Sequence, residues 1–337
     1  MHNPFQSLLS KICSGKSLLI GLALLTFVFV ACTSGNQIAS KVPEKVTLAY
    51  QPGINYANLL IVKQQQILEQ QFPQTKFEWK ELSNGAAIRD GILANQLQVG
   101  AGGVGPFLVG WDKGVGWKIL ASLNHSEFWL VVKNSNIKSL KDFKPGMKIG
   151  LPSPDSLQAI VLRRAAQKEL GNVTALDQNI QSIAHPLGFQ SLLNGQIDAH
   201  FTTPPFQFQE VEKGGRVILK SSDIFGKISA ASIFTTEKFY NQYPEFGKAL
   251  YTAIADATKL LNEKPDEAAK IISQIDGAKI SAEQYKKWIT DQAVEYGLEP
   301  RAFLKYGEFM HEIGMLNQQP KSIDELILPT LKGVGGD

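Results

Sequence analysis

Strand and helix patterns alternate along this chain, and this alternation constrains the fold more than any other feature. Apolar strand patterns at 46–50, 76–82 and 98–101 alternate with helical patterns at 56–71 and 86–95. Such alternation is typical of α/β units, in which helices cover the faces of a mostly parallel sheet. The sequence therefore predicts the α/β class.

The pattern then starts again. The strand pattern Lys148–Leu151 repeats Thr47–Tyr50 at an offset of 101 positions, and residues 192–199 repeat the apolar positions of residues 92–99 at an offset of 100. Because the two offsets agree to within one position, the sequence predicts two lobes of similar construction. From residue 246 onward the apolar spacing is that of helices.

The amino terminus has a basic, then apolar, then small-residue order that ends on a cysteine. Lys11 and Lys16 precede an apolar run of 14 residues, Leu18–Ala31, which Cys32 follows. This run is shorter than the ~20 residues that span a bilayer, and its order resembles the signal peptide of a bacterial lipoprotein. We expect cleavage before Cys32, its acylation, and a polar tether over residues 32–45; a transmembrane anchor or a buried helix is the alternative.

Loss of a signal peptide over residues 1–31 changes what the composition implies. The 34 basic residues fall to 32 against 31 acidic ones, so the mature chain is nearly neutral and no nucleic-acid partner is expected. Cys13 leaves with the signal, so neither a disulfide nor a thiolate metal site is expected. The remaining 306 residues suffice for two lobes with substantial cores.

Residues 100–105 read Gly-Ala-Gly-Gly-Val-Gly and match the spacing of a dinucleotide-binding loop. We favour another interpretation, because the motif follows the third strand of its lobe and Pro106 comes directly after it. Glycines also allow a ligand to approach the backbone, and the following helix presents free N–H groups. We expect no cofactor.

Signatures of hydrolases are missing from the sequence. Neither G-x-S-x-G nor H-E-x-x-H occurs, and the histidines are widely separated along the chain. We therefore do not expect an enzyme. A secreted hydrolase or transferase stays the alternative from a different functional class.

Several segments together resemble a known family: 46–53, 102–106, the Ser-Leu-Lys-Asp-Phe stretch within 139–150, and 193–206. Over about residues 45–315 the chain resembles the substrate-binding proteins of ABC importers for nitrate, alkanesulfonates and taurine. The resemblance implies a type II periplasmic-binding-protein fold. In that fold, two α/β lobes with parallel-rich sheets and flanking helices are joined by two crossover strands that act as a hinge.

The resemblance also implies domain boundaries and partners. With crossings near 128–132 and 230–234, lobe one combines 46–127 with 233–337, and lobe two is 128–232. A member of this family is exported and works in the periplasm or on the outer face of the cell membrane, held there by its lipid. It delivers a small-molecule solute to an ABC permease with its ATPase, and we expect a monomer.

The ligand is expected between the lobes, where loops leave the carboxyl ends of parallel strands. These loops precede helices, whose N–H groups favour a small organic or inorganic anion, and none of the five arginines falls in them. The expected ligand-binding residues are Gln51, Asn55, Tyr56, Gly102, Gly103, Val104, Phe128, Ser153, Asp155, Ser156, Gly188, Thr202, Thr203 and Phe206.

Two questions about this site stay open in the sequence. Asp155 could cap the helix that follows it or bind an amine on the solute. The solute could instead be a neutral or aromatic heterocycle, such as a thiamine-precursor pyrimidine, stacked on Tyr56, Phe128 or Phe206. No metal is expected.

Acylation of Cys32 can be tested in cells. We expect Cys32→Ser to abolish incorporation of labelled palmitate, because a hydroxyl cannot take the place of the thiol at the processing site. Cys13→Ser is the matched control and should label like the wild type. Equal labelling of the wild type and Cys32→Ser would contradict the lipoprotein interpretation.

Overall fold

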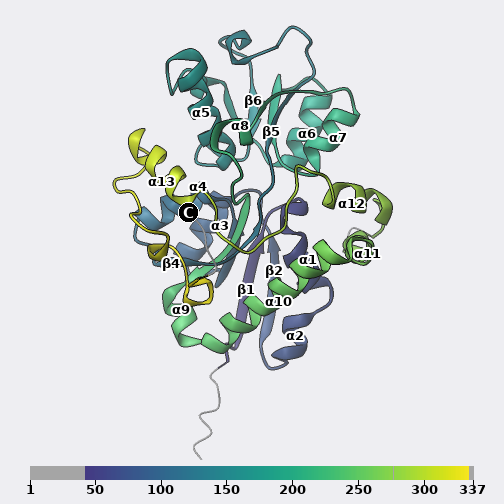
Figure 1. Cartoon of the computed structure of the whole chain (residues 1–337), viewed down its shortest axis with the longest axis vertical. Helices are drawn as coiled ribbons and strands as arrows, with labels where there is room; N and C mark the ends of the chain where they lie inside the picture. Colours follow the sequence, from purple (N-terminus) through teal and green to yellow (C-terminus); the bar gives the residue numbers. More distant parts are fainter. Residues whose placement is uncertain (1–41, 276, 334–337) are drawn as a thin grey trace, which may run out of the picture. The chain divides into compact units, whose positions relative to one another are not determined.

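The computed structural model describes residues 42–275 and 277–333. The predicted signal peptide, Cys32 and most of the predicted tether lie outside these residues. Within them the chain forms two five-stranded sheets with helices packed around them, which confirms the predicted α/β class (Figure 1).

The first sheet has the strand order β2-β1-β3-β10-β4. Its strands are β1 (Lys45–Tyr50), β2 (Lys76–Glu81), β3 (Val99–Gly102), β4 (Trp117–Asn124) and β10 (Ala231–Thr236). β1 is parallel to β2 and β3, whereas β10 is antiparallel to β3 and β4. The helices between β1 and β4 are η1 (Ile54–Tyr56), α1 (Ala57–Gln64), α2 (Ile67–Gln71), α3 (Gly85–Leu93) and α4 (Val104–Asp112).

The second sheet has the order β7-β6-β8-β5-β9. Its strands are β5 (Trp129–Val132), β6 (Ile149–Leu151), β7 (Ile180–Ser182), β8 (Ala199–Thr202) and β9 (Arg216–Lys220). Here β5 is the antiparallel strand, between β8 and β9. The helices of this part are η2 (Leu140–Asp142), α5 (Leu157–Leu170), η3 (Asp177–Asn179), α6 (His185–Leu193), α7 (Phe206–Glu212) and α8 (Ser222–Phe225).

The repeat seen in the sequence is a repeat of strand pairing. Leu48 of β1 pairs with Val99 of β3, and Ile149 of β6 pairs with Ala199 of β8. These partners differ by the same 101 and 100 positions that relate the two halves of the sequence. The two sheets are therefore built on the same plan and in the same register.

Each sheet is completed by a strand that arrives from the other half of the chain. β5 enters the second sheet directly after β4, and β10 enters the first sheet after β9 and α8. The predicted crossings, 128–132 and 230–234, fall largely on these two strands. The links between the sheets are residues 125–128 and 226–230, which contain neither helix nor strand.

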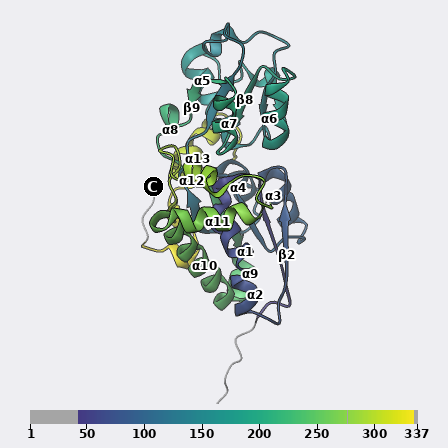
Figure 2. The ribbon, with the colours of Figure 1, turned by 90° about the vertical axis from the view of Figure 1, so that its right-hand side faces the viewer.

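The chain after β10 is helical, as its apolar spacing predicts. Its helices are α9 (Glu237–Gln242), α10 (Pro244–Glu263), α11 (Pro265–Ile275), α12 (Ala282–Ile289), α13 (Phe303–Glu312), η4 (Ile323–Glu325) and η5 (Pro329–Leu331). Figure 2 shows α10 and α11 beside α1 and α2, with which they make contacts. The C-terminal helices α10 and α11 thus return to the first sheet.

Two local differences from the predicted elements have simple causes. The helix predicted over 56–71 is interrupted at Gln66, whose φ of 53° lies in the left-handed region and separates α1 from α2. α4 begins at Val104, so Pro106 falls in its first turn. Proline is tolerated there because N–H groups of the first turn have no partner within the helix.

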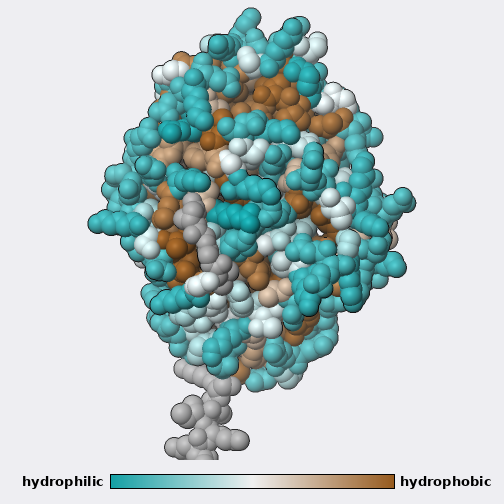
Figure 3. Space-filling model, viewed as in Figure 1, coloured by the Kyte–Doolittle hydropathy of each residue, from teal (hydrophilic) through white to brown (hydrophobic). Residues whose placement is uncertain are grey.

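Hydrophilic side chains cover most of the face seen in Figure 3, with hydrophobic side chains gathered in small patches. The large hydrophobic residues most exposed among the described ones are Leu93, Leu187 and Val211. In residues 42–275 and 277–333, no helix is both long enough and apolar enough to cross a membrane.

Candidate functional site

A pocket lies where loops of the two sheets meet. It encloses about 410 Å³ of space, part of which opens to solvent. Its walls are Gln51, Pro52, Asn55, Tyr56, Gly85, Gly103, Pro106, Phe128, Pro152, Ser156, Leu157, Gln158, His185, Thr203 and Ala230. Most of these residues directly follow β1, β3, β6 and β8, or open the next helix, which is the edge where the sequence predicts the ligand.

Half of the predicted ligand-binding residues line this pocket: Gln51, Asn55, Tyr56, Gly103, Phe128, Ser156 and Thr203. The sequence analysis missed the polar side chains of Gln158 and His185, which lie in the first turns of α5 and α6. A signal was present for His185, since it directly precedes Pro186 at the start of a helix that follows a strand.

The other seven predicted residues, Gly102, Val104, Ser153, Asp155, Gly188, Thr202 and Phe206, do not line the pocket. Gly102 ends β3, and a Cβ there would lie 3.2 Å from Nε2 of Gln51. Val104 is buried in the hydrophobic core, and Ser153 donates a hydrogen bond to Asp155 at 2.7 Å.

Asp155 does not cap the helix that follows it. Its carboxylate pairs with the guanidinium of Arg89, which comes from α3 beside the first sheet. The cap of α5 is Ser156, whose Oγ accepts a hydrogen bond from the Ala159 N–H at 3.2 Å. Arg89 thus reaches the predicted loops from α3. The sequence analysis considered only arginines within those loops and therefore missed it.

The loops of the two sheets touch directly. Asn55 donates a hydrogen bond from Nδ2 to Oγ1 of Thr203 at 2.5 Å. Gly105, the last glycine of the predicted glycine loop, lies against the backbone of Asp155, and a Cβ on it would come within 2.1 Å of the Asp155 carbonyl oxygen. Glycine is therefore needed here for close approach of two chain segments.

Tyr56 presents a hydroxyl to the pocket. Its oxygen accepts a hydrogen bond from Nε2 of Gln51 at 2.8 Å, so the hydroxyl keeps its own proton for donation. Burial raises the pKa of Tyr56 above its ordinary value, which keeps the hydroxyl protonated. Tyr56 can therefore act as a hydrogen-bond donor at any physiological pH.

The pocket carries no fixed charge. The described residues that line it include no Asp, Glu, Lys or Arg. Burial lowers the pKa of His185 well below its usual value, with a smaller contribution from His200, so His185 is neutral. The polar groups at the pocket are amides, hydroxyls, backbone groups and one imidazole.

Behind His185 lies a buried chain of hydrogen bonds. Nδ1 of His185 is 3.3 Å from Nε2 of His200, and Nδ1 of His200 is 2.5 Å from Oε1 of Glu210. The side chains of His200 and Glu210 are fully buried. Desolvation lowers the pKa of His200 to about 3 and raises the pKa of Glu210 to about 9. Both side chains are therefore uncharged at neutral pH.

Three of the predicted site residues surround this chain. A Cβ on Gly188 would lie 2.4 Å from Nε2 of His200, so only glycine leaves room for the ring. Thr202 places its hydroxyl 3.4 Å from Nδ1 of His185, and the ring of Phe206 stacks on His185 with centroids 6.0 Å apart. These residues support His185 from outside the pocket.

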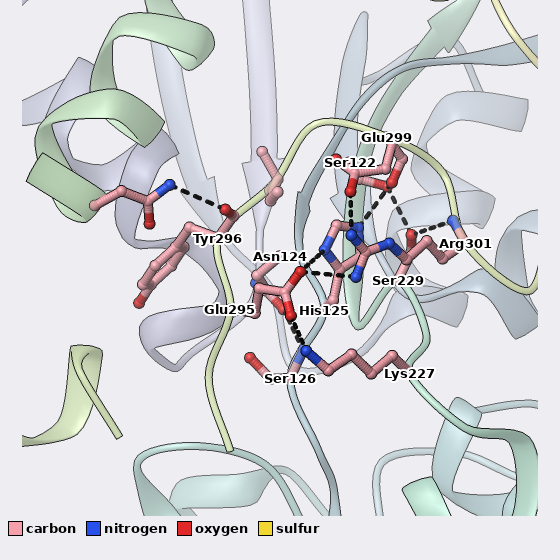
Figure 4. Close-up of polar contacts among 12 residues, drawn as sticks. Ser122, Asn124, His125, Ser126, Lys227, Ser229, Glu295, Tyr296, Glu299 and Arg301 are labelled. Carbon is pink, nitrogen blue, oxygen red and sulfur yellow. Dashed lines mark hydrogen bonds and ion pairs between the residues drawn. The ribbon is translucent and has the colours of Figure 1, made fainter. Parts of the chain in front are cut away.

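A second polar cluster ties the links between the sheets to the loop before α13 (Figure 4). Nε2 of His125 contacts the carbonyl oxygen of Glu299 at 2.8 Å, and the hydroxyls of Ser122 and Ser229 are 2.7 Å apart. Arg301 forms ion pairs with Glu295 and Glu299. The cluster holds both links and this loop together.

His125, Glu295 and Glu299 also bring potential metal-ligand atoms within 4.8 Å of one another. Arg301 neutralises both carboxylates, and Lys227 pairs with Glu295 as well. A divalent cation would have to displace these two positive groups. We therefore assign the cluster a structural role.

Comparison with known proteins identifies the family. Residues 39–276 match the NMT1-like family. The chain belongs to the NMT1-like family. It is also 24% identical over 208 residues to a protein of Escherichia coli named "Putative aliphatic sulfonates-binding protein", a match that spans 61% of this chain and 61% of that relative.

Solved structures show the same fold for this NMT1-like chain. The alkanesulfonate-binding protein of Xanthomonas axonopodis pv. citri bound to MOPS has a TM-score of 0.69 at 17% identity, covering 86% of this chain and 98% of that one. The periplasmic nitrate-binding protein of Synechocystis PCC 6803 has a TM-score of 0.68 at 16% identity, covering 84% of each chain. The predicted periplasmic-binding-protein fold and the resemblance to this group of proteins are confirmed.

The protonated state of Glu210 predicts how stability depends on pH. The folded protein keeps the Glu210 proton up to about pH 9, whereas the unfolded chain releases it near the ordinary pKa of 4.5. Stability therefore falls as pH rises, by about 1.4 kcal/mol per pH unit for one proton. Between pH 7 and 8.5, Glu210→Gln should lack this decrease in urea denaturation. Glu212→Gln is the control, and parallel curves for the wild type and Glu210→Gln would contradict the prediction.

Proposed function

We propose that this protein is the lipid-anchored, extracytoplasmic substrate-binding component of an ABC importer. In this proposal it binds a small organic or inorganic anion of the nitrate, alkanesulfonate or taurine class in a cleft between two lobes. The observation that carries the proposal is the pocket whose walls come from loops of both sheets.

The chemistry of the pocket suits capture without reaction. Hydroxyl and amide groups alternate with prolines and Phe128 around it, and such a mixture of a few polar groups with apolar walls is typical of small-molecule sites. Helices α4 and α5 begin at the pocket, so their free N–H groups and dipoles favour a negative group. We infer that the protein holds its solute and does not transform it.

The architecture supports closure around the solute. In this proposal lobe one is 46–127 with 233–337, lobe two is 128–232, and the links at 125–128 and 226–230 are the hinge. Asn55 and Thr203 join across the pocket, and Arg89 and Asp155 form an ion pair outside it, so each lobe supplies one partner of both pairs. A bound solute would add further bridges between the same loops.

The relatives give the proposal its ligand class and partners. The Escherichia coli relative is named for aliphatic sulfonates, and the two solved structures are named for alkanesulfonate and nitrate. Binding proteins of ABC importers hand their solute to a permease driven by an ATPase, which we propose as the partners here. Export and a lipid on Cys32 would keep the protein, as a monomer, at the membrane beside that permease.

One observation favours a second candidate ligand, a neutral or aromatic heterocycle such as a thiamine-precursor pyrimidine. The rings of Tyr56, Phe128 and His185 all line the pocket, and Phe206 stacks behind His185. Flat rings of this kind can hold a flat solute by stacking.

A panel of solutes tests the proposed function. We expect nitrate, taurine or an alkanesulfonate to bind one-to-one in calorimetry and to raise the melting temperature, because a ligand of the folded state stabilises it by mass action. At a hundredfold excess over Kd the gain is about 2.7 kcal/mol. Scattering should show a smaller radius of gyration with the bound solute. Turnover of a solute would contradict the proposal and favour a hydrolase or transferase, and binding of pyrimidines alone would favour the second ligand class.

The hydroxyl of Tyr56 gives a test at a single atom. Tyr56→Phe removes a donor to the ligand and should weaken binding of an anion by roughly 10- to 150-fold, the range for a hydrogen bond to a charged group. The matched control, Tyr240→Phe, changes a tyrosine of α9 that does not line the pocket and should bind normally. Equal affinity of Tyr56→Phe and the wild type in calorimetry would exclude this role.

A further inference from the structure

We propose that Arg89 and Asp155 form a latch between the two lobes, which sets how tightly the protein holds its solute although neither residue lines the pocket. The latch is the ion pair between the Arg89 guanidinium and the Asp155 carboxylate. This inference rests on the proposed function and its two lobes, and it assigns a role in binding to residues outside the site.

The partners of the latch come from different lobes and lie 66 positions apart in the sequence. Arg89 belongs to α3, beside the first sheet, and Asp155 belongs to the loop between β6 and α5 of the second sheet. Nη1 of Arg89 donates a hydrogen bond to Oδ2 of Asp155. Because movement of one lobe away from the other separates these two atoms, the pair can exist only while the lobes are together.

Both side chains are largely withdrawn from solvent, which distinguishes the latch from an ordinary surface ion pair. The Arg89 side chain is 12% exposed and the Asp155 side chain is 17% exposed, whereas Asp90, which also contacts the guanidinium, is 66% exposed. Water and salt screen such a withdrawn pair weakly. If one partner is removed, the other charge is left without its counterion in a poorly hydrated place, and opening of the lobes returns it to water.

Contacts in and around its loop hold the Asp155 carboxylate in position. Oγ of Ser153 donates a hydrogen bond to Oδ1 of Asp155 at 2.7 Å, which leaves Oδ2 for the guanidinium. Nη1 of Arg163 donates to the carbonyl oxygen of Pro154 at 2.6 Å. Gly105 lies against the Asp155 carbonyl. A carboxylate held in this way loses little conformational entropy when it pairs, so its ion pair is stronger than one between two mobile side chains.

The latch borders the pocket on both sides. Gly85 lines the pocket at the start of α3, and Arg89 lies one turn further along the same helix. Ser156 lines the pocket and directly follows Asp155. The ion pair therefore holds the lobes together at the edge of the pocket and uses no group that the solute contacts.

Another bond between the lobes has a different position. Asn55 and Thr203 both line the pocket, so a bound solute can replace either of them as the hydrogen-bond partner of the other. The ion pair of Arg89 and Asp155 lies outside the pocket and can remain intact when a solute is bound.

A latch changes affinity through the population of the closed form. A solute that needs both lobes binds with an apparent Kd equal to its Kd for the closed form divided by the fraction of molecules that are closed. An interaction that exists only in the closed form raises this fraction. Since a solute enters and leaves through the open form, loss of the latch should speed dissociation and leave association nearly unchanged.

Variants that keep the shape of each side chain test the latch. Asp155→Asn and Arg89→Gln each remove one charge, and either should raise both the dissociation rate and the Kd about five- to tenfold, between the effects of an exposed and a fully buried pair. The double variant should lose no more than either single variant, because the two residues act as one unit. Stopped-flow measurements use whichever of nitrate, ethanesulfonate and taurine binds the wild type most tightly.

Asp177→Asn is the matched control. Asp177 forms an ion pair with Arg163, whose Nε lies 2.9 Å from Oδ1 and whose side chain is also 12% exposed, but both residues belong to lobe two. This variant removes a similar ion pair without separating the lobes, so it should release the solute at the wild-type rate even if it is less stable.

Scattering by the proteins without solute is a second measurement. Asp155→Asn should have a larger radius of gyration than the wild type and Asp177→Asn, because its lobes open more often. Arg89→Gln should show the same increase, which keeps the test available if Asp155→Asn does not fold.

Dissociation at the wild-type rate in Asp155→Asn and Arg89→Gln would overturn the latch and leave the proposed function intact. Equally fast release by Asp177→Asn would also overturn it, since the effect would then follow from lost stability. If none of the three solutes binds the wild type, the proposed ligand class fails. Scattering then decides about the latch, and equal radii of gyration overturn it.

Discussion

The structure depends on an exchange of one strand between two sheets of the same plan. β5 completes the second sheet and β10 completes the first, each as an antiparallel strand inserted among parallel ones. Neither half of the chain can therefore form its sheet without the other. Because the exchanged strands are reached through short links, the loops at the carboxyl ends of both sets of parallel strands face each other, and these loops form the pocket.

The chemistry of the pocket follows from how its polar groups are buried. Fixed charges next to it are neutralised, as Arg89 is by Asp155, and the lining groups are neutral donors and acceptors. The lining residue that differs from these groups is the imidazole of His185, which hydrogen bonds connect to Glu210 through His200.

The sequence predicted the parts of the fold that depend on local patterns and missed those that depend on distant partners. The repeat offsets of 101 and 100 follow from apolar spacing, and the structure reproduces them. Seven of the expected ligand-binding residues line the pocket, and most of them directly follow strands or cap helices. The break at Gln66, the Arg89–Asp155 pair and the contact of Gly105 with Asp155 were not predictable, since no local pattern encodes which segments meet.

The sequence by itself determined the α/β class, the twofold repeat and the edge of the sheets at which the pocket lies, because periodicity and strand ends are local properties of the chain. Only the tertiary structure decided which side chains face the pocket and which support it from behind. Thr202, Gly188 and Phe206 look like ligand contacts along the sequence, yet they surround His185 and His200. The physical reason is that a histidine's hydrogen bonds, and the burial that removes its charge, are set by residues brought together from three elements, β8, α6 and α7.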